Sequence, residues 1–259
     1  MQFADLGQIS DWSDDRTTYV ANQRVVDFLT TKLTEEEEFK DYGADICPTM
    51  KERVAMFIFS QVANGIEYLH DVAYVANRDL KPDNILFTTK AGGTNIYLPD
   101  RAQITDFTTA FKFNRKTKDI VKISSRQGSP GFLAPEIMTQ TEYRPCPLDV
   151  WALGICMYAF IYETMPFWGT TESEIHQAII NNELVFPDDP PVSEQFKALM
   201  RALLTKDPSQ RPTISEAKAN FVWLQRPDFP SERPPPEEPK KESEDAAEEE
   251  KKDQDAAAD

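Results

Sequence analysis

Three short runs in the middle of the chain carry side chains that could bind a metal ion, accept a proton and offset negative charge. They are residues 77–86 (NRDLKPDNIL), residues 104–108 (ITDFT) and residues 128–136 (GSPGFLAPE). The carboxylate and amide side chains of these runs carry oxygen atoms of the kind that a hard cation prefers. Taken singly, Asp79 or Asp106 is more often a turn or capping residue, because Asp favours both positions. Only the occurrence of all three runs in one order favours a shared chemical role.

The order of these runs closely resembles that of the eukaryotic protein kinases. The runs match the catalytic loop H-R-D-L-x-x-x-N, the D-F-G metal motif and the A-P-E end of the activation segment. Lys81 and Pro82, after the aspartate of the first run, are typical of the serine/threonine class. The stretch from Gly128 to residues 165–168 (MPFW) is most similar to the calcium/calmodulin-dependent kinase kinases and their neighbours. The resemblance implies a serine/threonine protein kinase that uses ATP and Mg²⁺ and acts on a protein substrate.

The resemblance also implies roles for the polar side chains of the catalytic loop in phosphoryl transfer. Asp79 would orient the substrate hydroxyl and accept its proton, while Lys81 would offset the charge of the transferring phosphate. Asn84 and Asp106 would hold Mg²⁺. The catalytic set would then be Asp79, Lys81 and Asn84. The expected nucleotide contacts are Ala4 at the hinge edge, Leu86 beneath the adenine, and Asp106.

Further residues match positions that shape such a site without reacting. Ser129 matches the hydroxyl residue of the substrate-docking loop that bonds the catalytic aspartate. Glu136 and Arg211 match the buried ion pair that locks the activation segment to the helical lobe. Asp149 matches the helix-start aspartate that bonds the backbone of the catalytic loop. The expected role of these last three residues is structural.

Two serines, Ser124 and Ser125, lie where activation-loop phosphorylation often falls, and Arg78 could receive the phosphate. A plain solvated loop is an equally good interpretation of the same residues. His70 and His176 lie on predicted helices without a partner pattern, so neither is expected to bind metal or to catalyse.

Two substitutions inside the motifs concern their geometry. Asn77 stands where the family has a His that packs behind the metal motif. Thr108 stands where the family has a Gly, and a β-branched residue restricts the backbone torsions that Gly leaves free. Residues 91–101 (AGGTNIYLPDR) also lengthen the connection between the two expected strands. The charged residues of the motifs are all present, and these departures concern only how those residues are positioned.

The elements that must position these runs are mainly helical. Apolar residues at helical spacing predict helices over residues 50–70, 149–163, 171–182, 192–204 and 213–224. Two β-prone runs, residues 84–88 and 102–105, predict a short hairpin that carries the catalytic and metal loops. Residues 30–50 are interpreted as an exposed insertion. The expected fold is mainly α (α+β): the large lobe of a protein kinase, a helical bundle with one short β-hairpin.

Half of the kinase pattern is not found in these residues. None of the nine glycines fits G-x-G-x-x-G, and no strand carries a V-A-x-K lysine. Residues 1–7 (MQFADLG) resemble the hinge between the lobes. The expected organisation is a large lobe over residues 1–225, with an insertion at about 15–50 and no small lobe. The chain is therefore interpreted as a truncated kinase or an incomplete gene model. The alternative is a pseudokinase or regulatory fragment that binds a protein partner without autonomous catalysis.

The composition of the chain argues against several classes of protein. The chain has 44 acidic and 28 basic residues, and its net charge of −16 argues against nucleic-acid or anionic-membrane binding. The longest apolar stretch, residues 150–162, is too short to cross a bilayer. Residues 226–259 are rich in Pro, Glu and Lys, which predicts a disordered acidic tail. The absence of a signal-peptide pattern and of paired cysteines predicts a cytoplasmic location, with the nucleus left open.

Overall fold

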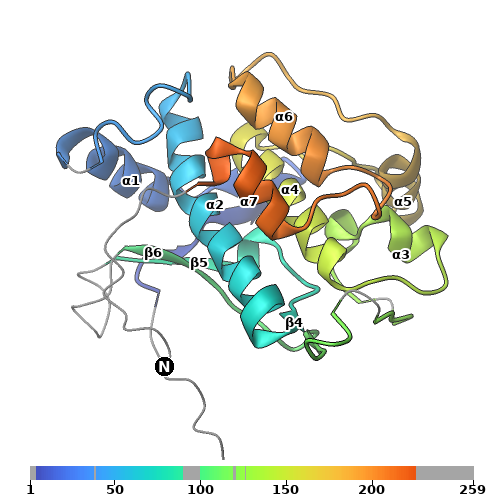
Figure 1. Cartoon of the computed structure of the whole chain (residues 1–259). Coiled ribbons are helices and arrows are strands. Elements are labelled where there is room, and N and C mark those ends of the chain that lie inside the picture. Colours follow the sequence, from blue (N-terminus) through green and yellow to red (C-terminus); the bar gives the residue numbers. More distant parts are fainter. Residues whose placement is uncertain (1–3, 38, 90–99, 119–120, 126, 226–259) are drawn as a thin grey trace, which may run out of the picture. The chain divides into compact units, whose positions relative to one another are not determined.

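The computed structural model describes residues 4–37, 39–89, 100–118, 121–125 and 127–225 (Figure 1). The predicted tail at 226–259 lies outside them, so its disorder stays a prediction. The described part is mainly helical with small antiparallel sheets, as predicted. Its α-helices are α1 (Gln23–Glu35), α2 (Met50–Tyr68), α3 (Pro135–Thr139), α4 (Cys146–Tyr162), α5 (Glu172–Asn181), α6 (Glu194–Leu203) and α7 (Ile214–Asn220). None of the helices described is both long and apolar enough to span a membrane.

Helix α2 forms where the apolar spacing predicted it. Val54, Ile58 and Ile66 repeat at helical intervals and are buried, so one face of the helix lies in the core. The Thr49 hydroxyl caps its start by accepting a hydrogen bond from a first-turn backbone N–H. The helix continues as a single π-helical turn over Leu69–Ala73, and three residues separate that turn from the first run, residues 77–86.

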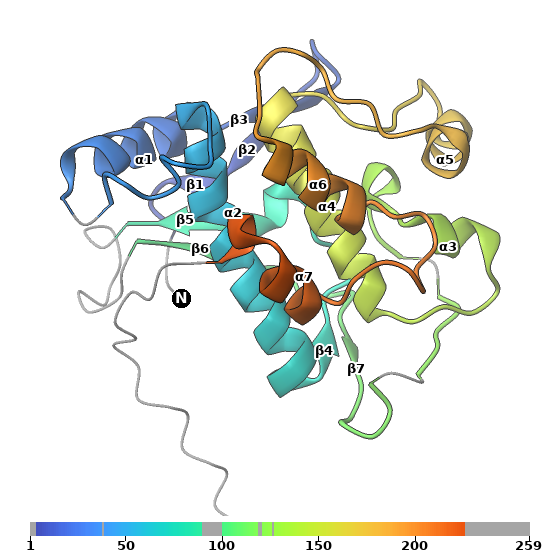
Figure 2. The ribbon, with the colours of Figure 1, turned by 45° about the horizontal axis from the view of Figure 1, so that its top comes forward.

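Helix α4 is apolar on all sides, and nearly all of it is buried. It begins three residues before the predicted start, because Pro147 is tolerated in the first turn of a helix. Helix α4 packs against α2 and α6, and α7 packs against α2. Figure 2 shows α6 and α7 lying over these two central helices. The core of the described part therefore lies between α2 and α4.

The three predicted C-terminal helices are confirmed, and each begins at a hydroxyl-bearing capping residue. Thr171, Ser193 and Thr213 each accept a hydrogen bond from a backbone N–H two or three residues into α5, α6 and α7. The last predicted helix is shorter than expected. Helix α7 ends at Asn220, and a 3-10 turn follows at Val222–Leu224.

The predicted hairpin is confirmed and is larger than expected. Strand β5 (Ile85–Thr88) pairs antiparallel with β6 (Arg101–Ile104), with Ile85 opposite Ile104. A third strand, β1 (Gly7–Gln8), pairs with the other edge of β5. The Thr105 backbone N–H donates to the Asn84 carbonyl at 2.8 Å. This sheet therefore brings the end of the first run beside the start of the second. A separate two-stranded sheet joins β4 (Val75–Ala76) to β7 (Phe111–Lys112).

The segment before α2 differs from the expectation of an exposed insertion. Strands β2 (Ser10–Ser13) and β3 (Thr18–Ala21) form an unpredicted hairpin, and α1 follows it. Leu29 and Leu33 of α1 are fully buried, and Phe39 beyond the helix is buried as well. The exposed interpretation of residues 30–50 is thus wrong for Leu33 and Phe39. The leucines share one helical face, which packs toward α2.

A buried carboxylate ties the start of α2 to two distant elements. Glu52 has no exposed surface. Its Oε2 accepts from the Ser193 backbone N–H at 2.9 Å, and its Oε1 accepts from Trp223 Nε1 at 3.0 Å and from the Ser193 hydroxyl. The carboxylate therefore holds α2, the start of α6 and the last 3-10 turn together.

We expect Glu52→Gln to lower the free energy of unfolding by about 3 kcal/mol. The neutral amide accepts weaker hydrogen bonds than the carboxylate, and its NH₂ group faces the Ser193 and Trp223 groups that donate to Glu52. Urea unfolding followed by circular dichroism measures this change. Glu37→Gln, at a side chain that is 85% exposed, is the matched control and should leave stability unchanged. A Glu52→Gln value within about 0.5 kcal/mol of wild type would contradict the structural role.

Candidate active site

The first run, residues 77–86, is anchored by the first turn of α4. The buried Asp149 carboxylate accepts from the backbone N–H of Asn77 at 2.8 Å and from that of Arg78 at 2.7 Å. His70, in the π-helical turn after α2, places its Nε2 2.8 Å from the same carboxylate. No role for His70 was predicted, because its partner lies 79 residues away and no local spacing links the two. Two core helices therefore fix the backbone of the run.

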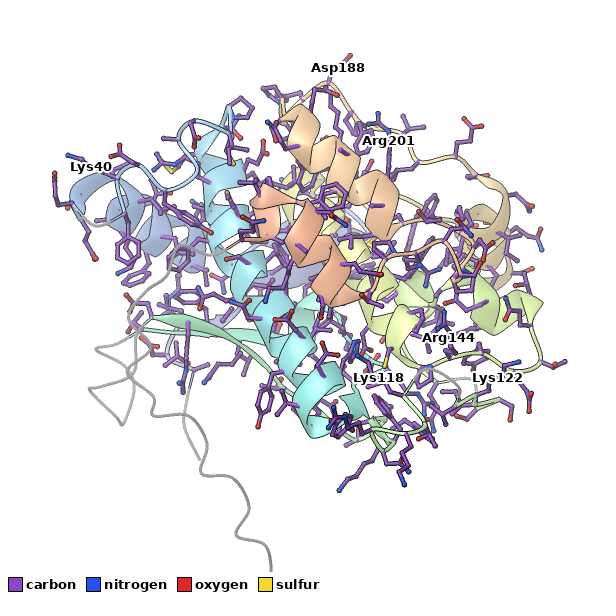
Figure 3. All side chains as sticks on the ribbon, in the orientation of Figure 1. Lys40, Lys118, Lys122, Arg144, Asp188 and Arg201 are labelled. Carbon is purple, nitrogen blue, oxygen red and sulfur yellow. The ribbon has the colours of Figure 1, made fainter. Side chains whose placement is uncertain are left out.

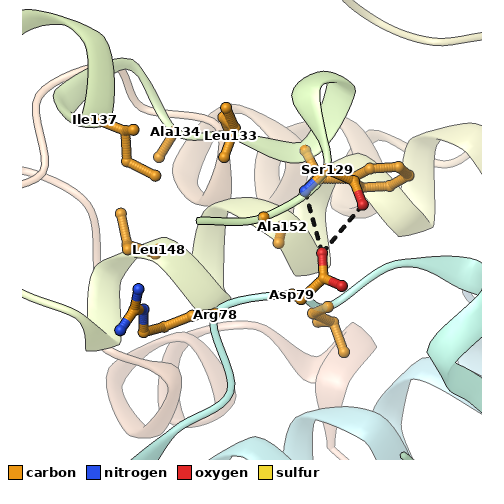
Figure 4. Close-up of a pocket in the computed structure, with 11 residues that line it drawn as sticks. Arg78, Asp79, Ser129, Leu133, Ala134, Ile137, Leu148 and Ala152 are labelled. Carbon is orange, nitrogen blue, oxygen red and sulfur yellow. Dashed lines mark hydrogen bonds between the residues drawn. The ribbon is translucent and has the colours of Figure 1, made fainter. Parts of the chain in front are cut away.

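Asp79 lies at the centre of a small polar cluster. Its Oδ1 accepts from the Ser129 backbone N–H and from the Ser129 hydroxyl, both at 3.1 Å (Figure 4). Lys81 Nζ donates to the Ser129 hydroxyl at 3.1 Å and lies 3.5 Å from Asp79 Oδ2. Asn84 Nδ2 donates to the Asp79 carbonyl at 2.9 Å. The structure therefore brings these four predicted site residues together.

Asn84 and Asp106 lie at adjacent ends of the β5–β6 pair. The Asn84 amide nitrogen is held by Asp79, which fixes the orientation of the side-chain oxygen. Asp106 is exposed, two residues beyond the end of β6. One carboxylate and one amide oxygen fit Mg²⁺, which takes few protein ligands and fills its other positions with phosphate and water oxygens. No group of three or more His, Cys, Asp or Glu side chains in the described residues has the geometry of a metal site.

Both motif substitutions form hydrogen bonds within this site. The buried Asn77 accepts from the Asp79 backbone N–H through Oδ1 and donates to the Asp106 carbonyl through Nδ2, both at 3.1 Å. Asn77 thereby links the first run, residues 77–86, to the second run, residues 104–108. Thr108 donates to Asp106 Oδ1 from its backbone N–H at 3.1 Å and from its hydroxyl at 2.7 Å. The β-branched residue is accommodated, and its hydroxyl holds the Asp106 side chain.

The Thr108 hydroxyl, followed by the Thr108 backbone N–H, lowers the pKa of Asp106. We expect Thr108→Val, which removes the hydroxyl but keeps the N–H, to raise the pKa of Asp106 toward its ordinary value. Carbon-detected NMR titration of the aspartate carboxyls measures this directly. Ser209→Ala is the matched control, because Ser209 donates to Asp207 in the same way and lowers the pKa of that residue. An unchanged Asp106 titration in Thr108→Val would show that the hydroxyl has no effect.

The two predicted nucleotide contacts at the sheet are both partly exposed. Leu86 lies on β5 and pairs with Gln8 of β1. Ala4 lies three residues before β1, and its carbonyl accepts from the Gly7 backbone N–H at 3.2 Å. The described chain therefore passes beside Leu86 at Gln8, four residues after Ala4.

Arg78 follows Asn77 and points away from Asp79, as Figure 4 shows. Its side chain is buried, and burial lowers the pKa of the guanidinium. It donates to the Ser125 hydroxyl at 2.9 Å and to Gln127 Oε1 at 2.7 Å. Among the described residues, Arg78 Nε has no hydrogen-bond partner. The side chain of Arg78 is thus a buried cation whose hydrogen-bond partners are neutral.

Two further basic residues lie near the predicted phosphorylation sites. Ile123 and Tyr143 form an isolated antiparallel bridge, so Lys122 and Arg144 lie on neighbouring segments of the backbone (Figure 3). The exposed Ser124 and Ser125 follow directly.

Glu136 and Arg211 form a bidentate ion pair that joins α3 to the loop between α6 and α7. The two hydrogen bonds measure 2.8 and 3.0 Å, and both side chains are fully buried. The Arg211 guanidinium also lies over the Trp151 ring, 5.1 Å from its centroid.

The hairpin β2–β3 adds a residue that the sequence did not indicate. The Tyr19 hydroxyl donates to Asp83, the residue before Asn84 in the first run. Burial, followed by the bond to Asp83, raises the pKa of Tyr19 far above its ordinary value. The contact was not foreseen because the hairpin itself was not predicted.

The chain matches the protein kinase domain family over residues 16–223. It is 32% identical over 198 residues to the serine/threonine-protein kinase ssp1 of Schizosaccharomyces pombe, which covers 70% of this chain and 29% of that protein. It is 32% identical over 196 residues to the calcium/calmodulin-dependent protein kinase kinase of Caenorhabditis elegans, covering 73% of this chain and 34% of the relative. The human SNF-related serine/threonine-protein kinase is 29% identical over 201 residues, or 78% of this chain and 24% of that protein. The aligned parts thus make up about a quarter to a third of these relatives.

Proposed function

Because the chain belongs to the protein kinase domain family, we propose that it transfers a phosphoryl group from ATP to a serine or threonine hydroxyl of a protein substrate. The observation that carries this proposal is the cluster of Ser129, Asp79, Lys81 and Asn84. Lys81 and Asn84 both lie within hydrogen-bonding or ion-pairing distance of the aspartate.

The cluster suits a substrate hydroxyl. Ser129 holds Asp79 Oδ1 with two hydrogen bonds, which orients Oδ2 to accept the proton of an incoming hydroxyl. Lys81 lies 3.5 Å from Oδ2, where its charge would offset that of a transferring phosphate. Asn84 and Asp106 would hold Mg²⁺, and bound Mg²⁺-ATP would supply the phosphoryl group. Ala4 and Leu86 are proposed to contact the nucleotide.

The similarity to a calcium/calmodulin-dependent kinase kinase supports a relationship to that group. We also propose that residues 1–259 alone correspond to the large lobe and have little activity. The sequence of these residues contains neither the G-x-G-x-x-G pattern nor the V-A-x-K pattern of the loop and lysine that cover the phosphates in the family. A site open to water on one side loses preorganisation and with it electrostatic stabilisation.

Phosphorylation of Ser125 is proposed as part of this function. A phosphate there would give the buried Arg78 an anionic partner, with Lys122 and Arg144 close by. Mass spectrometry of the purified protein, before and after phosphatase treatment, tests this assignment. A Ser125 that is never modified in active protein would contradict it.

One observation favours the alternative, a pseudokinase or regulatory fragment that binds a protein partner. Asp106 Oδ1 already accepts two hydrogen bonds from Thr108, and Phe107 is 46% exposed beside it. If Thr108 withheld that oxygen from a metal, the site would bind partners without transferring phosphate.

A phosphoacceptor assay separates the two functions. The protein should be the longest polypeptide that its own transcript encodes, including any residues that precede residue 1. Peptides that differ only in Ser, Thr or Tyr at one position are incubated with Mg²⁺-ATP and read by mass spectrometry. We expect phosphate on serine and threonine and little on tyrosine. Preference for tyrosine, or no transfer at all, would contradict the proposal.

A further inference from the structure

The buried Tyr19 of strand β3 contacts two 3-10 turns of the site at once. Its hydroxyl donates to the Asp83 carboxylate, which lies in the turn Pro82–Asn84. Its ring lies edge-on to the ring of Phe132 in the turn Pro130–Phe132, with 5.7 Å between the two centroids. One side chain of the hairpin β2–β3 therefore joins two turns that are far apart in the sequence.

Both turns adjoin residues that hold Asp79. Asn84 ends the first turn, and its Nδ2 donates to the Asp79 carbonyl at 2.9 Å. Ser129 directly precedes the second turn and gives Asp79 Oδ1 two hydrogen bonds of 3.1 Å. The Phe132 backbone N–H donates to the Ser129 carbonyl at 2.9 Å, which closes this turn on Ser129. A shift of either turn would therefore move a group that orients Asp79.

The Tyr19 hydroxyl is well suited to hold Asp83. The Asp83 side chain is half-buried, and it forms no ion pair with the Lys, Arg and His side chains that the structure describes. A hydrogen bond to a carboxylate is stronger than one between two neutral groups. Burial, followed by the bond to Asp83, raises the pKa of Tyr19 far above its ordinary value. The phenol therefore keeps its proton, and the bond persists, at any pH at which phosphate transfer would be measured.

The hairpin that carries Tyr19 is also bonded to the end of the first run. The Ile9 backbone N–H, just before β2, donates to the Ile85 carbonyl at 3.0 Å. The Asn22 backbone N–H, just after β3, donates to the Ile9 carbonyl at 2.9 Å, which closes the base of the hairpin. The same hairpin thus holds the first run at two neighbouring points, Asp83 and Ile85.

We propose that Tyr19 is a positioning residue for phosphoryl transfer, which acts through Asp83 on the turn that places Asn84 and Asp79. The inference rests on the proposed function and adds a residue outside the three runs to the set that transfer requires. Phosphoryl transfer depends mainly on placement and electrostatic stabilisation, so a small displacement of these groups lowers the rate without removing any of them.

The first test is Tyr19→Phe, which removes the hydroxyl and keeps the ring beside Phe132. In the longest natural polypeptide, we expect the single-turnover rate at saturating Mg²⁺-ATP and serine peptide to fall about tenfold. The affinities for nucleotide and for peptide should stay within about twofold of wild type, because only the placement of reacting groups has changed. An unchanged rate would overturn the proposal. A weaker peptide affinity with an unchanged saturated rate would also overturn it, because Tyr19 would then be a substrate contact.

Tyr158→Phe is the matched control. Tyr158 is buried on α4, and its hydroxyl donates a hydrogen bond to the Val185 carbonyl at 2.9 Å. Burial raises the pKa of Tyr158 to about 12, so this phenol is also a permanent donor. Both variants lose one hydroxyl from a buried tyrosine and should lower the Tm to a similar degree, but only Tyr19→Phe should slow transfer. Equal slowing by the two variants would indicate a general loss of stability and overturn the proposal.

A double-mutant cycle tests whether Tyr19 acts through Asp83. In the Asp83→Ala background the hydroxyl has no carboxylate to hold, so adding Tyr19→Phe should change the rate by less than about twofold. A further fall as large as that in the wild-type background would show that Tyr19 acts independently of Asp83, which would overturn the proposal.

An NMR measurement on the same proteins separates this inference from the kinase proposal. The side-chain amide signals of Asn84, assigned by their loss in Asn84→Asp, report the hydrogen bond to Asp79 without any phosphate transfer. We expect these amide protons to exchange with water about tenfold faster in Tyr19→Phe and at the wild-type rate in Tyr158→Phe. Faster exchange in a protein that transfers no phosphate would support the placement of Asn84 by Tyr19 and contradict the kinase proposal. Unchanged exchange in Tyr19→Phe would overturn the inference, whatever the rate of transfer.

Discussion

Replacing Asp106 with alanine should abolish Mg²⁺-dependent nucleotide binding together with phosphoryl transfer, whereas replacing Asp79 with alanine should abolish transfer alone. The difference follows from the positions of the two carboxylates. Asp106 lies next to Asn84 at the proposed metal position, while Asp79 is held by Ser129 at the proposed position of the substrate hydroxyl. Loss of the proton acceptor should slow transfer by about 10²- to 10⁴-fold.

Calorimetric titration with Mg²⁺-ATP and a peptide phosphorylation assay, on the longest natural polypeptide, measure the two effects separately. Asp188→Ala, in an exposed loop between α5 and α6, is the control and should change neither quantity. Equal loss of nucleotide binding in Asp79→Ala and Asp106→Ala would show that the roles have been assigned wrongly.

Arg211→Met should be the most destabilising of the substitutions considered, costing about 3–5 kcal/mol of unfolding free energy. It leaves the Glu136 carboxylate buried without its two charged hydrogen bonds. Removing both partners, in Glu136→Leu with Arg211→Met, should cost less than Arg211→Met alone, because no buried charge is left unpaired.

Urea unfolding of the wild type, Arg211→Met and the double variant measures this order of stability. Lys197→Met, which breaks an exposed pair with Glu194, is the control and should have little effect. A double variant that is less stable than Arg211→Met would contradict the explanation by an unpaired buried charge.

The sequence predicted best those elements whose signal is local. Helix α2 has a regular apolar period, and α5, α6 and α7 begin at hydroxyl caps. The hairpin β2–β3 lacks such a signal. Its turn, residues 14–17 (DDRT), contains no Gly or Asn, although Thr17 adopts a positive φ of 51°. Helix α1 was missed because the segment was interpreted as an insertion, although Val25, Leu29 and Leu33 follow a helical period.

The same distinction holds within the site. The sequence and its resemblance to a family named Asp79, Lys81, Asn84 and Ser129, and the structure brings them together. Neither the sequence nor the family resemblance could predict that Asn77 links Asp79 to Asp106. Asn77 replaces the His of the family, so the family pattern does not say which hydrogen bonds its side chain forms. Contacts such as that of His70 with Asp149 join residues far apart in the chain, and only the packing of the helices creates them.

The central claim, that the cluster around Asp79 transfers phosphate, is tested most directly by one comparison. The initial rate of phosphate transfer from ATP to a serine peptide is measured at saturating Mg²⁺-ATP for the longest natural polypeptide and for its Asp79→Asn variant. The account predicts steady transfer by the wild type and a rate at least about 100-fold lower in Asp79→Asn, with nucleotide affinity unchanged. Equal rates in the two proteins, or no transfer by the wild type, would contradict it.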